Sequence, residues 1–122
     1  MSIKYLILKD KFDFETVEKL KNYSFDEIEP IIPNLLEWLQ DMNWPVSRPI
    51  ADFLLPYSEE ISSEVLKILQ SKDEMWKYWI LLTFGKSIKN KSVHQEITRI
   101  VQNPTKDEIE NDVFEIAQEI LK

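Results

Sequence analysis

Apolar residues recur at helical spacing along most of the chain, and this pattern restricts the fold more than any other feature of the sequence. Phe14, Val17 and Leu20 stand three residues apart, so their side chains share one face of a helix. Similar stripes recur at 35–39, 46–54, 61–69, 75–84, 93–101 and 109–121. Only Tyr5 to Leu8 forms a short apolar run that can be extended, and no segment alternates convincingly between apolar and polar residues. The pattern predicts an all-α fold of about seven helices.

Polar residues and the single glycine predict where these helices begin and end. Side chains that can cap a helix N-terminus precede most of the stripes, at Asp13, Ser24, Asn43, Ser58, Asp73 and Thr105. Glu27 and Glu108 each follow a Ser or Thr at the spacing of a capping box. Pro45 suits the first turn of the helix that Asn43 would cap. Gly85 follows an apolar stripe and fits the left-handed position at a helix C-terminus.

Two similar segments suggest an internal repeat. EVLKILQ at 64–70 and EITRIVQ at 96–102 are each followed closely by Lys-Asp-Glu. The second segment begins 32 residues after the first, and a period of this size is typical of helical-hairpin solenoids. Amphipathic helices also match one another by pattern alone. We expect a single domain over 1–122, in which antiparallel hairpins form a compact right-handed stack. Residues 1–11 are an N-terminal segment that can be extended.

The composition excludes several kinds of chemistry. The chain of 122 residues contains no cysteine, one histidine and one glycine. Without cysteine there are no disulfides, thiolate metal ligands or cysteine nucleophiles. A phosphate-binding loop requires several glycines, and metal-binding motifs such as HExxH do not occur. We therefore expect no cofactor, no metal and no enzymatic activity, and acid catalysis by a carboxylate pair is the chemistry that the sequence leaves open.

The charge of the chain restricts its partners. The net charge is −7 at pH 7, and phosphate binding requires clustered Lys and Arg, so we expect no nucleic acid partner. An acidic surface instead attracts a basic partner. The longest uncharged apolar run, Tyr78 to Gly85, is far shorter than the roughly 20 residues that span a bilayer. The N-terminus lacks the apolar core and cleavage site of a signal peptide. We expect a cytoplasmic protein with no membrane association, either monomeric or weakly dimeric.

The segment from Glu37 to Pro49, EWLQDMNWPVSRP, combines aromatic and polar residues at a junction between predicted helices. Each residue has a structural explanation, since Asp41 or Asn43 can bind free N–H groups at the next helix start. A tryptophan before a proline is nevertheless an unusual choice for such a junction. Asp41, Asn43, Trp44 and Arg48 can together form a polar and aromatic patch that binds a ligand or a partner. We favour the structural role at the helix junction, and a binding patch is the alternative.

The segment from Met75 to Phe84, MWKYWILLTF, is apolar around almost its whole circumference. Such a helix is expected to be central and buried on most sides. Lys77 is its only charged residue. The ammonium group of Lys77 can reach solvent or pair with Asp73 one turn earlier. In the sharper interpretation, a partly desolvated Lys77 binds an anion in a pocket.

A series of acidic residues marks the last predicted helix: Glu108, Glu110, Asp112, Glu115 and Glu119. We expect these carboxylates to lie on the solvated flank of that helix. They are also the residues that would meet a basic partner.

Two tryptophan-rich segments carry a resemblance to a known family. WLQDMNWPV at 38–46 and WKYWILL at 76–82 resemble a small bacterial family described only as a domain of unknown function, and EITRIVQNPTKDE at 96–108 is similar to that family as well. The likeness covers the chain from about residue 11 to the end. The resemblance implies an α-helical domain in the style of HEAT repeats, and it implies no activity. The sequence departs from standard HEAT repeats in two ways. Its period is short, and no copy carries a clear Asp followed by a Val-Arg pair.

These observations predict a non-enzymatic protein-interaction module. An immunity-type inhibitor that covers a basic toxin surface is a special case of this prediction. The alternative is a small-ligand-binding domain that uses the corner from Asp41 to Arg48, with Lys77 as a further candidate residue.

Overall fold

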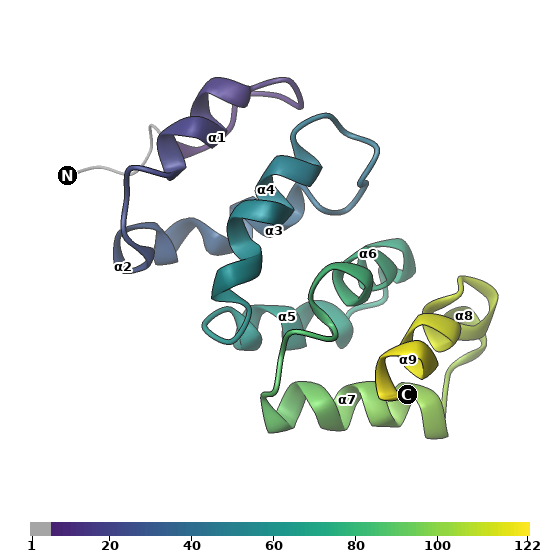
Figure 1. The fold of residues 1–122 in the computed structure, drawn as a ribbon. Helices are drawn as coiled ribbons and strands as arrows, with labels where there is room; N and C mark the ends of the chain where they lie inside the picture. Colours follow the sequence, from purple (N-terminus) through teal and green to yellow (C-terminus); the bar gives the residue numbers. More distant parts are fainter. Residues whose placement is uncertain (1–5) are drawn as a thin grey trace. The chain divides into compact units, whose positions relative to one another are not determined.

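The computed structural model describes residues 6–122, and within that range the chain is helical with no strand. The all-α prediction is therefore confirmed, while Tyr5 of the possible extended run lies outside the described residues. The helices divide into two compact units, Met1–Tyr57 and Ser58–Lys122 (Figure 1). No described helix combines the length and the apolar character that crossing a membrane requires. The single domain, the right-handed stack and the HEAT-like repeat stay predictions.

The first unit consists of short helices separated by turns. They are α1 (Phe14–Leu20), α2 (Phe25–Ile28), a 3₁₀ turn (Glu29–Ile31), α3 (Ile32–Glu37), α4 (Ser47–Leu54) and a second 3₁₀ turn (Leu55–Tyr57). Asp13 caps α1 by accepting a hydrogen bond from the Thr16 N–H at 3.1 Å. Ser24 and Glu27 form the predicted capping box at the start of α2. Local polar chemistry therefore fixes these two helix starts, as the sequence predicts.

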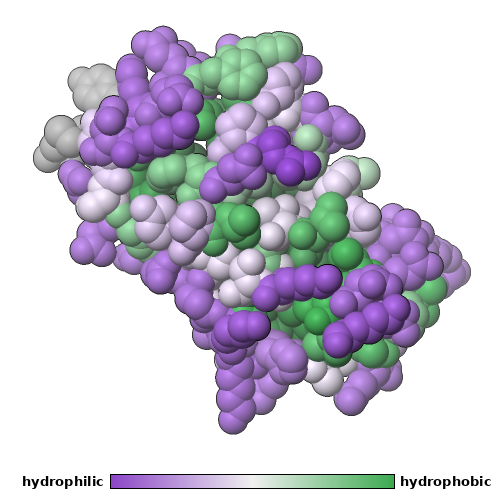
Figure 2. All heavy atoms as spheres, in the orientation of Figure 1, coloured by the Kyte–Doolittle hydropathy of each residue, from purple (hydrophilic) through white to green (hydrophobic). Residues whose placement is uncertain are grey.

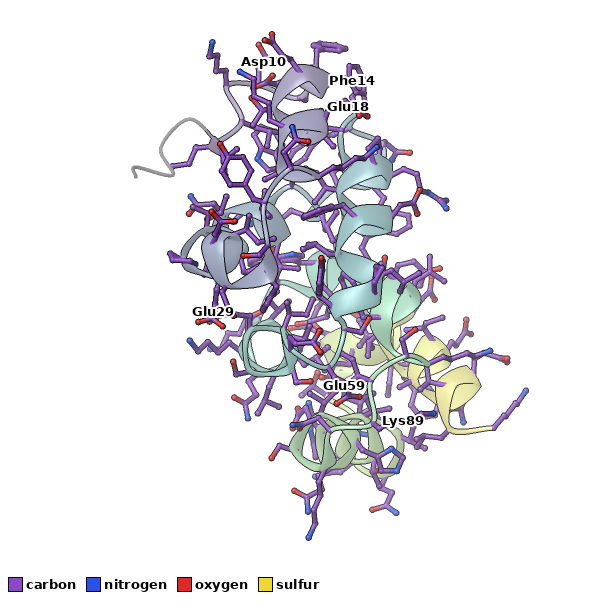
Figure 3. All side chains as sticks on the ribbon, turned by 60° about the vertical axis from the view of Figure 1, so that its left-hand side comes forward. Asp10, Phe14, Glu18, Glu29, Glu59 and Lys89 are labelled. Carbon is purple, nitrogen blue, oxygen red and sulfur yellow. The ribbon has the colours of Figure 1, made fainter. Side chains whose placement is uncertain are left out.

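The core of the first unit contains residues of the predicted apolar stripes and, in addition, Ile28 and Ile32. Its fully buried side chains include Leu20, Ile28, Ile32, Leu35, Leu36, Leu39, Ile50 and Leu54. Aromatic rings add to this packing, because Tyr57 stacks on Phe25 with ring centroids 5.1 Å apart and meets Phe53 edge to face at 5.9 Å. Phe14 is instead exposed on α1, where Figure 3 labels it.

The second unit contains α5 (Ser62–Leu69), α6 (Glu74–Phe84), α7 (Lys91–Gln102), α8 (Lys106–Glu110) and α9 (Val113–Leu121). Helix α9 packs against α6, α7 and α8, and α5 packs against α6 and α7. The two similar sequence segments lie in α5 and α7. Asp73 caps α6 and the Thr105–Glu108 capping box begins α8, as predicted. The Lys89 N–H donates to the Glu59 carboxylate, which ties the α6–α7 connection to the turn before α5 (Figure 3).

Two of the predicted N-caps are wrong. Helix α4 begins at Ser47 with Val46 at its N-cap, not with Asn43, and Pro45 precedes the helix. Helix α5 begins at Ser62 with Ile61 at its N-cap, not with Ser58. In both cases a serine occupies the first helical position, and its hydroxyl donates a hydrogen bond to a carbonyl of the preceding turn. Ser47 donates to the Asp41 carbonyl, and Ser62 donates to the Glu59 carbonyl. The extra turn displaces each helix start from the capping residue that the sequence suggests.

Gly85 is not left-handed, contrary to the prediction. Its φ of −55° and ψ of −41° are ordinary right-handed values. A Cβ atom at this position would collide with the Ile120 side chain and lie 2.6 Å from the Leu81 carbonyl oxygen. The glycine is therefore required for the close approach of α9 to the end of α6.

The predicted helix over 109–121 is broken into α8 and α9. Asp112 lies between them in the left-handed region, with φ 66°. The break turns Ile109 away from the core, so this residue of the predicted stripe is 52% exposed. Val113 and Ala117 of α9 keep their predicted buried positions.

Candidate functional site

Helix α6 has one buried face and one exposed face, and both are apolar apart from Lys77 on the buried face. Its buried side is formed by Lys77, Ile80, Leu81 and Phe84. At about 100° per residue, Met75, Tyr78, Trp79 and Leu82 fall on the opposite side. Met75 is 59% exposed and Leu82 is 52% exposed, while the two aromatic residues are half-buried. The expectation that this helix is buried on most sides is therefore wrong on the side of Met75 and Leu82. We call Met75, Tyr78, Trp79 and Leu82 together the exposed face of α6.

The aromatic pair on this face contains an unpaired donor. The Tyr78 and Trp79 rings meet edge to face with centroids 5.1 Å apart. The indole Nε1 of Trp79 is buried and has no hydrogen-bond partner among residues 6–122. Buried donors are usually paired, so this one carries an energetic cost.

An open groove lies beside the exposed face. Its volume is about 450 Å³, and its lining residues are Tyr78, Asp112, Glu115, Ile116, Gln118 and Glu119. Tyr78 comes from α6, and the rest come from α9 and the residue before it. We call this the α6–α9 groove. Figure 2 shows hydrophobic surface between hydrophilic side chains over the part of the molecule where these two helices lie.

Carboxylates form the rim of the α6–α9 groove. Asp112 and Glu115 are exposed, and neither forms an ion pair within the described part of the chain. Glu119 lies 3.0 Å from Lys122, and both side chains are mostly exposed. Glu110 is also exposed, so four residues of the predicted acidic flank lie where the sequence places them.

Glu108 is the exception, because its side chain is 0% exposed. Its carboxylate accepts hydrogen bonds from Arg99 at 2.6 and 2.8 Å, from Lys77 at 3.1 Å and from the Thr105 N–H at 2.8 Å. The expectation of an exposed Glu108 is wrong because these donors converge on it from three segments. The same carboxylate therefore closes the capping box of α8 and joins α8 to α6 and α7.

Lys77 is buried, at 4% exposure, and does not reach solvent. Its ammonium group lies 3.1 Å from the carboxylate of Glu74 and 3.1 Å from that of Glu108, rather than beside Asp73. The anion for this buried lysine thus comes from the protein itself. A ligand-binding role for Lys77 stays a prediction.

The buried cluster has a distinct electrostatic balance. Burial raises the pKa of Glu108, but hydrogen bonds from Arg99, the Thr105 backbone and Lys77 outweigh it and lower that pKa to about 2. The hydrogen bond to Glu108 raises the pKa of the Arg99 guanidinium, against the effect of burial and with further support from Glu96. Each of these charges therefore has at least one partner of opposite sign within the cluster.

The corner from Asp41 to Arg48 lies in the first unit, and Lys77 lies in the second. Asp41 forms a local turn, in which its carboxylate accepts from the Asn43 N–H at 2.9 Å and its carbonyl accepts from the Trp44 N–H at 3.1 Å. Trp44 meets Trp38 edge to face at 5.7 Å and is half-buried. Asn43 and Arg48 are exposed. Asp41 and Trp44 therefore have structural roles at the junction, and ligand binding by this patch stays a prediction.

The fold and the site define an all-helical protein with an exposed apolar helix face beside an acidic groove. The chain belongs to the family described as Domain of unknown function (DUF5071), whose sequence profile matches residues 6–121. This confirms the resemblance noted in the sequence and carries it a few residues further toward the N-terminus. No curated protein matches the sequence.

Proposed function

We propose that this protein is a non-enzymatic protein-binding module and that its binding surface is the exposed face of α6. One observation carries the proposal: Met75 and Leu82 are each more than half exposed on a helix that has no polar face. Contiguous apolar surface of this kind marks interaction sites in soluble proteins. The half-buried rings of Tyr78 and Trp79 supply the aromatic residues that are enriched in binding hot spots.

The energetics support binding at this face. Complete burial of a Met or Leu side chain contributes about 1.5–3 kcal/mol. Because more than half of each side chain is exposed, a partner that covers both would gain roughly 2 kcal/mol from these two residues alone. The charged cluster contributes no such surface, since Lys77 and Arg99 both bind Glu108.

The acidity of the chain supports a basic partner. An immunity-type inhibitor is the special case in which that partner is a toxin with a basic surface, and the cytoplasm remains the expected compartment. We expect the free protein to be a monomer or a weak dimer.

Leu82 and Ile109 allow a matched test, because each is 52% exposed in the second unit and they lie on different helices. Tagged wild-type protein, Leu82→Ser and Ile109→Ser are used to capture partners from cells of the native organism. We expect one partner to be retained by wild type and Ile109→Ser and lost with Leu82→Ser. Equal capture by all three proteins, with unchanged helical circular dichroism, would contradict the proposal.

A further inference from the structure

We propose that the partner segment is an amphipathic helix with one apolar face and Lys or Arg along its flank, and that it docks along the exposed face of α6 and the α6–α9 groove. This inference rests on the proposed function and adds the chemistry of the partner.

The apolar part of the surface is continuous along α6. Tyr78 belongs both to the exposed face and to the lining of the groove. Met75 and Leu82 stand about one turn before and after it on the same side of the helix. Met75 and Leu82 lie seven positions apart, which corresponds to about 10 Å along the helix axis. This length matches two turns of a partner helix that presents anchors at i, i+3 or i+4, and i+7.

The wall of the groove opposite Tyr78 is also partly apolar. Ile116 of α9 is half-buried and lines the groove together with Gln118. A helix laid between α6 and α9 would thus meet apolar side chains from both, which is the arrangement of helix-in-groove recognition.

The carboxylates of the groove favour a partner helix that carries Lys or Arg along its flank. Asp112 stands immediately before α9, and Glu115 and Glu119 lie one turn apart within it, and all three line the groove. Asp112 and Glu115 have no ion-pair partner within residues 6–122, and the surface pair of Glu119 with Lys122 is readily exchanged. Lys or Arg along the flank of a docked helix would meet these carboxylates. These charges raise association rates and exclude acidic competitors.

The charge also argues against a second copy as the occupant. A second copy would bring another chain of net charge −7 to this acidic rim. Like-charge contact disfavours such a complex, whereas a basic segment gains from the same field.

The test uses a synthetic peptide of leucine and lysine in which the leucines occupy one helical face. Isothermal titration measures its binding to the full chain, to Leu82→Ser, to Glu115→Gln/Glu119→Gln and to Glu110→Gln. Glu110 is an exposed carboxylate on α8 outside the groove lining, so its variant is the charge control. We expect roughly three- to tenfold weaker binding for the groove double variant, weaker binding for Leu82→Ser, and unchanged binding for the control.

Two further peptides separate shape from charge. A peptide with the same residues in scrambled order, and a leucine–glutamate peptide, should both bind more weakly than the amphipathic basic peptide. Equal binding of either peptide, or equal weakening by Glu110→Gln, would overturn the inference. So would a dimer in sedimentation that Leu82→Ser dissociates, since the occupant would then be a second copy. If Leu82→Ser loses a cellular partner while the basic peptide binds all variants equally, the proposed function stands and this inference fails.

Discussion

The ammonium group of Lys77 and the carboxylate of Glu108 lie 3.1 Å apart, and both side chains are almost completely buried. The contact joins α6 to α8 across 31 residues of sequence. Glu108 also binds Arg99 of α7 at 2.6 Å, so one carboxylate connects three helices of the second unit. Because Glu108 is shared by both cations, its loss leaves Lys77 with only Glu74 and Arg99 with only Glu96.

We expect Glu108→Ala to be strongly destabilising. The substitution leaves Lys77 buried with only Glu74, and it also removes the capping box with Thr105. Breaking a buried ion pair from one side costs about 3–5 kcal/mol of unfolding free energy. Urea unfolding followed by circular dichroism measures the change. The control is Glu110→Ala, an exposed residue of the same helix, which should remain within about 0.5 kcal/mol of wild type. Similar losses for both variants would mean that the cluster does not stabilise the fold.

The same carboxylate predicts how stability depends on pH. The pKa of Glu108 is lowered from 4.5 to about 2 in the folded protein. A lowered pKa stabilises the fold above the unfolded value of 4.5, and this contribution is lost as pH falls toward 2. The difference in unfolding free energy between wild type and Glu108→Gln should therefore shrink by roughly 3 kcal/mol over that window. Urea titrations at several pH values measure it, and a difference that stays constant with pH would contradict the expectation.

Local features of the fold could be predicted from the sequence. The caps at Asp13, Asp73 and Thr105 depend only on residues within one turn, so short-range spacing identifies them. The apolar stripes likewise predict the buried faces, because helical periodicity follows from backbone geometry. Family membership also followed from the two tryptophan segments.

Features that depend on distant residues could not be predicted in this way. No spacing rule links Lys77 to Glu108, and only the presence of a lone charge in an apolar helix signals that some partner is needed. The position of Gly85 after an apolar stripe predicts a left-handed helix terminator. The close packing of Ile120 against Gly85 is instead the reason that a glycine is needed there. The exposed face of α6 could not be predicted for the same reason. When a helix is apolar around its whole circumference, the sequence does not indicate which side is exposed.

The corner around Asp41 gives a prediction about which of its residues support the junction before α4. The Ser47 hydroxyl is buried beside the Trp38 and Asp41 carbonyls, so Ser47→Ala should lower the unfolding free energy by about 1–3 kcal/mol. Arg48→Ala, at an exposed position, should have almost no effect on stability. Thermal unfolding compares the two variants. A large loss of stability with Arg48→Ala would show that the arginine has a structural role that its exposure does not suggest.

Gly85→Ala should destabilise the second unit because its Cβ would collide with Ile120. Overpacking of this kind costs about 1–3 kcal/mol. Ile120→Val removes the terminal methyl group that meets the new Cβ, so the double variant should recover part of the loss. A double-mutant cycle by urea unfolding measures the coupling between the two sites. Strictly additive effects would mean that the close approach of α9 to Gly85 is not what selects glycine.

Asp112 connects the geometry of the α8–α9 break to the proposed binding groove. Its φ of 66° is a left-handed conformation that glycine adopts without strain, so Asp112→Gly should leave stability unchanged or raise it by up to about 1 kcal/mol. The same substitution removes one carboxylate from the rim of the groove, so it should weaken binding of the basic amphipathic peptide. Asparagine also tolerates this left-handed conformation. Asp112→Asn should therefore weaken peptide binding to a similar extent without raising the unfolding free energy. Thermal unfolding and titration calorimetry on the same samples measure both effects. If Asp112→Gly lowers stability and peptide binding together, the loss of affinity would follow from a disturbed α9 rather than from the missing charge.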